Sequence, residues 1–199
     1  MVQKIIVCSR SQEKTDEVRN VLQKYGIEVV SIAELGIENL DDVRDVARQV
    51  GALVALDVAN MTGECCLCDD CMLTVNALAE QKKMFNLRID VENADKQMDE
   101  VLDVLGKNNE YDRNALMTCV LVLAFPSNGD KKQETHMFLG EVKGRISPFK
   151  YSGSGNDFER IFSPNGYRQT LAQIQIEEKN QISHVGGALH DLAAFLTNE

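Results

Sequence analysis

The first 32 residues carry the pattern that most restricts the fold, because they alternate between strand and helix. Residues 4–8 (KIIVC) are a short apolar run that predicts a buried strand. Residues 12–25 place apolar side chains at helical spacing, with Tyr25 on the inward face, and Gly26 is typical of a helix end. Residues 27–32 predict a second strand. Strands joined through a helix pair in parallel with a right-handed crossover, so we expect an α/β fold.

The turn between the first strand and helix has residues that suit an anion. Ser11 is placed to cap the helix, and Lys14 follows in its first turn. Helix N-terminal amides and a lysine at the carboxyl edge of a parallel sheet can receive a phosphate. The turn lacks the glycines of a P-loop, so this signal is weak alone.

Residues 64–77 (ECCLCDDCMLTVNA) place two adjacent carboxylates inside an apolar stretch. The pattern predicts one strand that ends at Asp69 and Asp70 and a second strand that leaves them. The pair can hold a divalent cation or take a proton from water, because adjacent carboxylates disfavour double ionisation without a cation. A solvated turn between two strands remains the alternative, since aspartate is a common turn residue.

Four of the six cysteines crowd into residues 65–71. Cys65, Cys68 and Cys71 form a CxxCxxC run, which raises the question of a zinc or iron–sulfur site. Alternate side chains of a strand face opposite ways, and no second cysteine pair or suitably spaced histidine follows. We therefore favour reduced, buried thiols that pack as small apolar residues, with metal ligation as the alternative.

Bulk properties restrict the partners. The chain has 199 residues, which suits a single domain over residues 1–199. Its formal net charge of −10 disfavours nucleic acid and anionic membranes as partners. There is no apolar run of the roughly 18 residues that a membrane span needs, and the N-terminus lacks the features of a signal peptide. The expected location is the cytoplasm.

The remainder predicts three helices and a hairpin. The first of these helices is capped by Asp41 or Asp42 and runs to about Asn60, with Leu53 facing inward. Met61 is expected in the core. Residues 115–125 are the strongest strand, and Asn128-Gly129 predicts an antiparallel hairpin with residues 134–146. A single helix is expected to open at Glu177, and its double glycine, Gly186-Gly187, indicates close packing or a local break.

The order of these pieces resembles the inosine triphosphate pyrophosphatase family, house-cleaning enzymes that hydrolyse ITP, dITP and XTP to a monophosphate and pyrophosphate. The motifs that carry the resemblance are KIIVCS with Lys14, CDDCMLTVNAL, RNALMTCVLVL, GEVKGRI, IFSPNGY and EEKNQISH. The resemblance implies an α/β fold with a mixed, curved sheet, helices on both sides, and two lobes around a central nucleotide cleft. It also implies Mg²⁺ as cofactor, a purine nucleoside triphosphate as ligand, and a homodimer.

The resemblance assigns roles to particular residues. Asp70 matches the general base and metal ligand, with Asp69 beside it. Ser9, Ser11 and Lys14 match phosphate-facing positions, while Lys179, Ser183 and His184 match positions that contact the base and phosphates. Glu159 matches the position of an aspartate that contacts the edge of the purine, and Phe158 is the candidate to take over stacking on the purine.

Several positions depart from the family pattern. Gln49 stands where the family has a metal-ligating glutamate, Asn156 where it has the stacking phenylalanine, and Val185 where it has an arginine that helps discriminate the 6-oxo group. Cys71 and Met72 replace the usual Ser-Gly. These changes favour a relative that binds dITP or ITP with impaired or absent hydrolysis, a pseudoenzyme acting as a nucleotide sensor or regulatory subunit.

By analogy at the level of the fold, such a subunit suits an antiviral defence assembly in which the nucleotide licenses an effector protein partner. Two other functions stay open. One is an active Mg²⁺-dependent pyrophosphatase, in which Asp70 activates water. The other is an interaction protein without a ligand.

Overall fold

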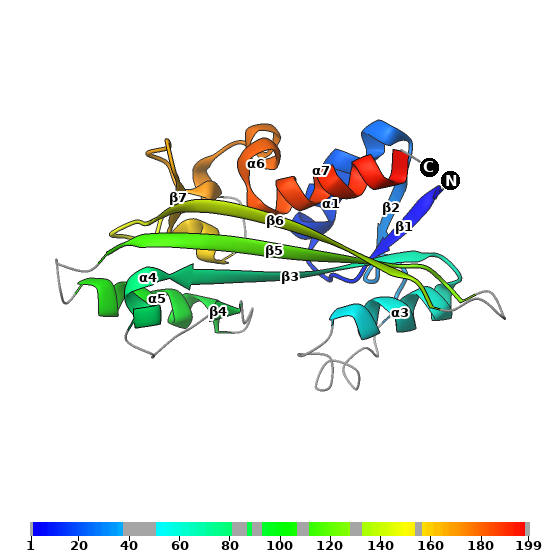
Figure 1. Ribbon diagram of the computed structural model, residues 1–199, viewed down its shortest axis with the longest axis horizontal. Helices are drawn as coiled ribbons and strands as arrows, with labels where there is room; N and C mark the ends of the chain where they lie inside the picture. The colour runs from blue at the N-terminus through cyan, green and yellow to red at the C-terminus, as the bar shows by residue number, and fades with distance from the viewer. Residues whose placement is uncertain are drawn as a thin grey trace. The chain divides into compact units, whose positions relative to one another are not determined.

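The computed structural model describes residues 2–37, 51–80, 87–88, 93–106, 112–127, 133–153 and 157–197. It has an α/β fold built on a mixed, seven-stranded sheet with strand order β2-β1-β3-β5-β6-β7, and β4 pairs with β3 (Figure 1). The strands are β1 (Lys4–Val7), β2 (Glu28–Ser31), β3 (Cys65–Val75), β4 (Leu87–Arg88), β5 (Asn114–Ala124), β6 (Thr135–Ile146) and β7 (Phe162–Pro164). The helices are α1 (Gln12–Leu22), α3 (Gly51–Thr62), α4 (Asn76–Glu80), α5 (Ala94–Gly106), α6 (Ile176–Ile182) and α7 (His184–Thr197), with 3-10 turns η1 (Gln23–Tyr25), η2 (Asp157–Arg160) and η3 (Leu171–Gln173).

The opening strand, helix and strand form the expected parallel unit. β1 pairs in parallel with β2 from Lys4↔Glu28 to Val7↔Ser31, and with β3 from Ile5↔Cys65 to Val7↔Leu67. Gly26 ends the helical segment at φ 74°, a left-handed conformation that glycine adopts without cost. The prediction of a parallel start is confirmed.

The central aspartates lie inside one strand, so the prediction of two strands around a turn is wrong. β3 continues from Cys65 through Asp69 and Asp70 to Val75, and both aspartates are half-buried. The stretch contains no glycine, proline or asparagine that would favour a turn. Because adjacent strand residues face opposite sides of a sheet, an uninterrupted strand places one carboxylate on each face.

β5 and β6 form the predicted antiparallel hairpin. The Phe125 N–H donates to the Glu134 carbonyl at 3.0 Å, and the Ile146 N–H donates to the Arg113 carbonyl at 2.9 Å. The residue numbers of both pairs have the same sum, which only antiparallel strands produce. The predicted turn at Asn128-Gly129 lies outside the described residues.

The chain divides into two compact units, each built from segments far apart in sequence. Unit 1 contains residues 1–70, 120–139 and 188–199, and unit 2 contains residues 71–119 and 140–187. In unit 1, α1 and α3 cover opposite faces of the sheet (Figure 1), and the buried residues of α3 pack with Ile6, Cys66 and Val122. In unit 2, one apolar cluster joins Met98 and Val101 of α5 to Phe158 and Phe162.

The C-terminal region contains two helices where one was predicted. α6 ends at Ile182, Ser183 is extended at φ −84° and ψ 163°, and α7 begins at His184. A Cβ atom added at Gly186 would lie 2.1 Å from the Asn180 carbonyl oxygen. The backbones of α6 and α7 therefore approach so closely that only glycine fits, and the double glycine marks both a break and a close contact.

Three predicted inward positions are exposed. Tyr25 is 51% exposed because it lies in the 3-10 turn η1, where the α-helical spacing no longer applies. Leu53 is 46% exposed and lies about 200° around α3 from the buried Ala55. Met61, near the end of α3, is 67% exposed. None of the described helices is long and apolar enough to cross a bilayer.

Candidate functional site

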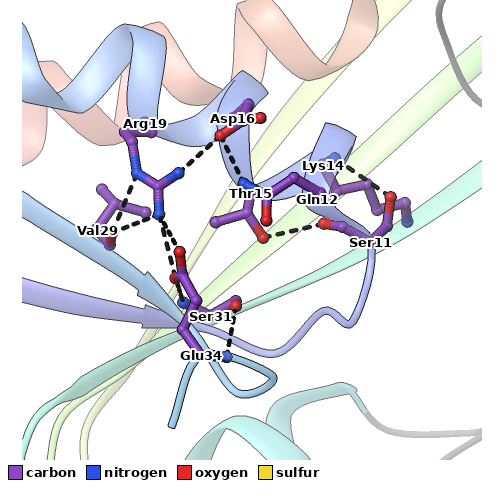
Figure 2. A network of polar contacts seen from close by, with 9 residues as sticks. All are labelled: Ser11, Gln12, Lys14, Thr15, Asp16, Arg19, Val29, Ser31 and Glu34. Carbon is purple, nitrogen blue, oxygen red and sulfur yellow. Dashed lines mark hydrogen bonds and ion pairs between the residues drawn. The ribbon is translucent and has the colours of Figure 1, made fainter.

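The first loop of unit 1 is shaped by the side chains of Ser9 and Ser11, and Figure 2 shows the contacts of Ser11. The Ser9 hydroxyl oxygen accepts a hydrogen bond from the Ser11 N–H at 3.1 Å, and the Ser11 hydroxyl oxygen accepts one from the Lys14 N–H at 3.4 Å. The Thr15 hydroxyl donates to the Ser11 carbonyl at 3.0 Å. Ser11 is therefore the predicted N-cap of α1, and Ser9 holds the turn that leads into it.

Arg19 fastens α1 to the neighbouring strand, as Figure 2 shows. Its guanidinium donates to Asp16 at 2.7 Å, to the Val29 carbonyl at 3.1 Å and to Glu34 at 2.9 Å. Glu34 in turn accepts from the Ser31 N–H at 2.7 Å, and this bond, with Arg19, lowers the pKa of Glu34. The network fixes the rotation of α1 about its axis, and hence the direction in which Lys14 projects.

Lys14 meets one of the central aspartates. Its ammonium Nζ lies 2.5 Å from Asp69 Oδ2, and the two side chains are 24% and 21% exposed. A charge-assisted bond of this length between partly buried groups is among the stronger polar contacts in proteins. The structure thus brings together two residues that the sequence predicted for one site although they lie 55 positions apart.

Asp70 belongs to the other face of β3. Cys66 and Cys68 pack in the cluster that contains the buried residues of α3, and strand alternation places Asp70 on that same face. A Cβ atom added at Gly51 would lie 4.0 Å from Cys68 Cβ, so α3 begins over this side of β3. Gln49, predicted at the position of a metal ligand, lies outside the described residues.

The carboxylates fit Mg²⁺ in their donor chemistry, although not as a pair on one face. Mg²⁺ is usually held by one or two carboxylates together with waters and substrate phosphates. Asp69 is already neutralised by Lys14, and it faces away from Asp70. Asp70, on the face that α3 covers, could also hold the ion, which would supply charge neutralisation for phosphate oxygens.

A second group of predicted residues lies in unit 2. Lys179 Nζ lies 3.1 Å from Glu159 Oε2, and these side chains are only 5% and 2% exposed. Ser183 and His184 follow at the junction of α6 and α7, and both are buried. The Ser183 hydroxyl oxygen accepts from the Gly186 N–H at 3.0 Å, so Ser183 caps α7.

Phe158 lies within the core of unit 2. Its side chain is fully buried and packs in the same cluster as Met98, Ile161 and Phe162. Its role as a base-stacking residue stays a prediction, and stacking would require the ring to leave this core. Asn156 lies outside the described residues.

Three cysteines of unit 1, Cys8, Cys66 and Cys68, form a cluster that the sequence predicted only in part. The Sγ atoms of Cys8, Cys66 and Cys68 all lie within 4.8 Å of one another, and those of Cys8 and Cys66 are 3.0 Å apart. Hydrogen bonds from Cys66 and Cys68 lower the pKa of Cys8 to about 5. Burial raises the pKa of Cys65, on the other face of the strand, to about 11. The signal was the Cys-x-Cys spacing at 66 and 68, which puts both thiols on one face.

Known proteins match nearly the whole chain. The sequence profile of the Ham1 family matches residues 5–195. A dITP/XTP pyrophosphatase of Flavobacterium psychrophilum is 32% identical over 197 residues, which cover 98% of this chain and 99% of the relative. A dITP/XTP pyrophosphatase of Desulfotalea psychrophila is 30% identical over 202 residues, which cover 98% of this chain and 85% of the relative.

Solved structures agree with this match. The Ham1 protein of Staphylococcus aureus is similar with a TM-score of 0.70 and 26% identity, over 98% of each chain. A HAM1 protein from Coxiella burnetii has a TM-score of 0.73 at 24% identity, over all of both chains, and this likeness concerns the fold alone.

Proposed function

The chain belongs to the Ham1 family, and from this premise we propose that it is a nucleoside triphosphate pyrophosphatase. The proposed substrates are dITP, ITP and XTP. In the proposed reaction a water oxygen attacks the α-phosphorus, the bond to the bridging oxygen breaks, and a nucleoside monophosphate and pyrophosphate form. Asp70 takes the proton from the attacking water.

The observation that carries this proposal is the contact between Lys14 and Asp69. The pairing of β1 with β3 ends at Val7 opposite Leu67, so Asp69 and Asp70 both lie beyond the end of β1, at the edge of the sheet where ligands bind. An ammonium held at 2.5 Å from a carboxylate keeps its place without a ligand. It can exchange part of that contact for a phosphate oxygen when a triphosphate binds. Ser9 and Ser11 shape the turn beside it, and their hydroxyls and the first amides of α1 suit further phosphate oxygens.

The decisive experiment measures pyrophosphate release from dITP, ITP, XTP and dATP with and without Mg²⁺. We expect turnover of the inosine and xanthosine nucleotides, dependent on Mg²⁺. Replacing the proposed base by Asp70→Asn should reduce kcat by about 10²- to 10⁴-fold, the usual contribution of general base catalysis. The matched control is Asp57→Asn, which removes an exposed carboxylate of α3 and should leave kcat unchanged.

A second candidate function is nucleotide binding without hydrolysis. It is supported by Val185, a buried apolar residue where the resembled family has an arginine, and by Lys179, whose charge Glu159 already neutralises. In this case the protein serves as a dITP or ITP sensor, and the ligand-bound form regulates an effector protein, as in an antiviral defence assembly.

The two functions give different results on the same sample. A ligand at about 100 times its Kd adds about 2.7 kcal/mol to the free energy of unfolding, so binding alone appears as a thermal shift without pyrophosphate. A thermal shift without turnover would contradict the pyrophosphatase and support the sensor. If the protein is a pyrophosphatase whose catalysis is only weakened, Gln49→Glu should raise its turnover, because it supplies a carboxylate for Mg²⁺.

Two further expectations accompany the proposal. The resemblance predicts a homodimer, which sedimentation analysis of the purified chain tests. A cytoplasmic location is expected for an enzyme that acts on cellular nucleotides, and fractionation of the source cells tests it.

A further inference from the structure

Three thiols converge in unit 1 because of the register between two strands. β1 and β3 pair in parallel with Ile6 opposite Cys66, and the Cys8 N–H donates to the Leu67 carbonyl at 2.8 Å. Moving two residues along each strand keeps the same face. Cys8 therefore lies beside Cys66 and Cys68, on the face of the sheet that α3 covers.

The surroundings of this cluster are apolar. Cys66 is fully buried, Cys68 is 7% exposed, and both pack with Ile6, Ala55 and Ala59. Cys8 is half-buried, so it is the thiol of the three that solvent reaches most readily. A ligand that enters past Cys8 meets three sulfur atoms in a site that largely excludes water.

The spacing of the sulfur atoms suits a metal ion. A metal–sulfur bond of about 2.3 Å in a trigonal or tetrahedral site places its sulfur ligands roughly 4 Å apart. The closest pair here, Cys8 and Cys66, is at 3.0 Å, and every pair lies within 4.8 Å. Side-chain movements of about 1 Å or less bring the three sulfurs to bonding distance.

We propose that Cys8, Cys66 and Cys68 bind one soft d¹⁰ metal ion, of which Cu(I) is the best match. Among the described residues, the cluster consists of three sulfur ligands and includes no histidine or carboxylate. Thiolates select soft ions, and structural zinc sites almost always have four ligands. On binding, each thiol loses its proton to the solvent, and no electrons are transferred. The proposal does not rest on the proposed pyrophosphatase activity, although Asp70 follows Cys68 by two residues on the same face of β3.

The other buried cysteines show that burial alone does not make this site. Cys65 and Cys71 lie on the same strand and are as buried as Cys68, but they belong to its opposite face. They are expected to behave as small apolar residues. Cys65 therefore offers a control with matched burial, one residue from a proposed ligand.

The test uses the full chain, reduced with a phosphine and kept free of oxygen so that a disulfide cannot replace the metal site. Cu(I) is added in competition with bicinchoninate, and bound copper is counted by native mass spectrometry. We expect one Cu(I) per chain, with an ultraviolet sulfur-to-metal charge-transfer band. Cys8→Ser and Cys68→Ser should each abolish retention of the ion, whereas Cys65→Ser should retain it.

Cys8 is half-buried, so Cys8→Ser keeps the test valid if Cys68→Ser fails to fold, and circular dichroism checks both variants. The proposal is overturned if the native chain releases all Cu(I) to the competitor, or if Cys8→Ser binds as much as the native chain. It is also overturned if Cys65→Ser loses the ion while folded, or if the chain retains Zn²⁺ but not Cu(I).

Discussion

At the scale of the residue, the contact with the largest cost of removing charge from water is the ion pair between Lys179 and Glu159. Both side chains are almost completely removed from water, at 5% and 2% exposure. Removing two charges from water is costly, and their mutual attraction offsets that cost only while both are present. Two residues predicted to contact a nucleotide therefore also hold each other in the absence of one.

We predict that Glu159→Gln lowers the free energy of unfolding by about 3–5 kcal/mol, because it leaves the buried ammonium of Lys179 without its counter-charge. Urea denaturation measures this loss. The double variant Glu159→Leu with Lys179→Met should recover most of the stability, since it removes both charges.

The control for this prediction is a pair on the surface. Lys4 and Glu28 lie 3.5 Å apart with side chains 28% and 62% exposed. Glu28→Gln should change the free energy of unfolding by less than about 1 kcal/mol. If Glu28→Gln and Glu159→Gln lower the free energy of unfolding equally, burial of the ion pair is not what makes the Glu159 substitution costly.

Glu34 gives a prediction about pH. The bond from the Ser31 N–H and the contact with Arg19 lower its pKa below the usual value. A lowered pKa in the folded state adds stability above the unfolded pKa, and this is lost as pH falls through the folded pKa. The stability difference between the native chain and Glu34→Gln should therefore be constant near neutral pH and shrink below about pH 4. A difference that grows as pH falls would contradict this.

At the scale of the element, the junction of α6 and α7 depends on one glycine. A Cβ atom at Gly186 would lie 2.1 Å from the Asn180 carbonyl oxygen and 2.9 Å from the Asn180 Cα, so backbone would have to move. At Gly187 the nearest atom would be the Gly140 Cα at 3.7 Å, an ordinary van der Waals distance.

These two glycines predict opposite outcomes for the same substitution. Gly186→Ala should destabilise the protein by about 1–3 kcal/mol or more, because it overpacks a helix junction. Gly187→Ala should be neutral or stabilise by up to about 1 kcal/mol, because alanine favours the helix. Thermal unfolding of both variants measures the difference, and equal effects would show that the close approach does not hold in solution.

The elements predicted correctly from the sequence are those in which the apolar pattern and the turn residues favour the same structure that the tertiary fold contains. The antiparallel hairpin and the parallel start follow from apolar runs and turn residues, and the structure has both. The break at Ser183 was missed because the apolar spacing continues through it, with Val185, Leu189, Leu192 and Leu196 all buried. The spacing of apolar side chains contains no information about a backbone contact such as that of Gly186 with Asn180.

At the scale of the whole molecule, net charge yields a prediction about partners. A formal net charge of −10 repels a polyanion over the range of the Debye length. We expect no binding of a labelled DNA duplex at low salt, where electrostatic attraction would be strongest. Fluorescence anisotropy measures this, and binding that weakens steeply with added salt would reveal a basic surface that outweighs the net charge.

Some residues of the candidate site could be predicted from the sequence, but most of their contacts could not. Motif resemblance named Lys14 and Asp69, and the fold brings them into contact. The pairing of Glu159 with Lys179, 20 positions apart, has no local signal. Cys8 joins Cys66 and Cys68 only through the register of β1 and β3. Contacts that depend on register or on the folding back of distant segments require the tertiary structure.

The chain passes between its two units four times, after Asp70, Cys119, Leu139 and Gly187. No single cut, and no exchange of one contiguous stretch of gene, can therefore separate the units or transfer one of them to another protein. Recombination within the coding sequence would leave each product with fragments of both. The coding segments of the two units are therefore interleaved in the gene, and one exchange that reaches past a boundary carries parts of both.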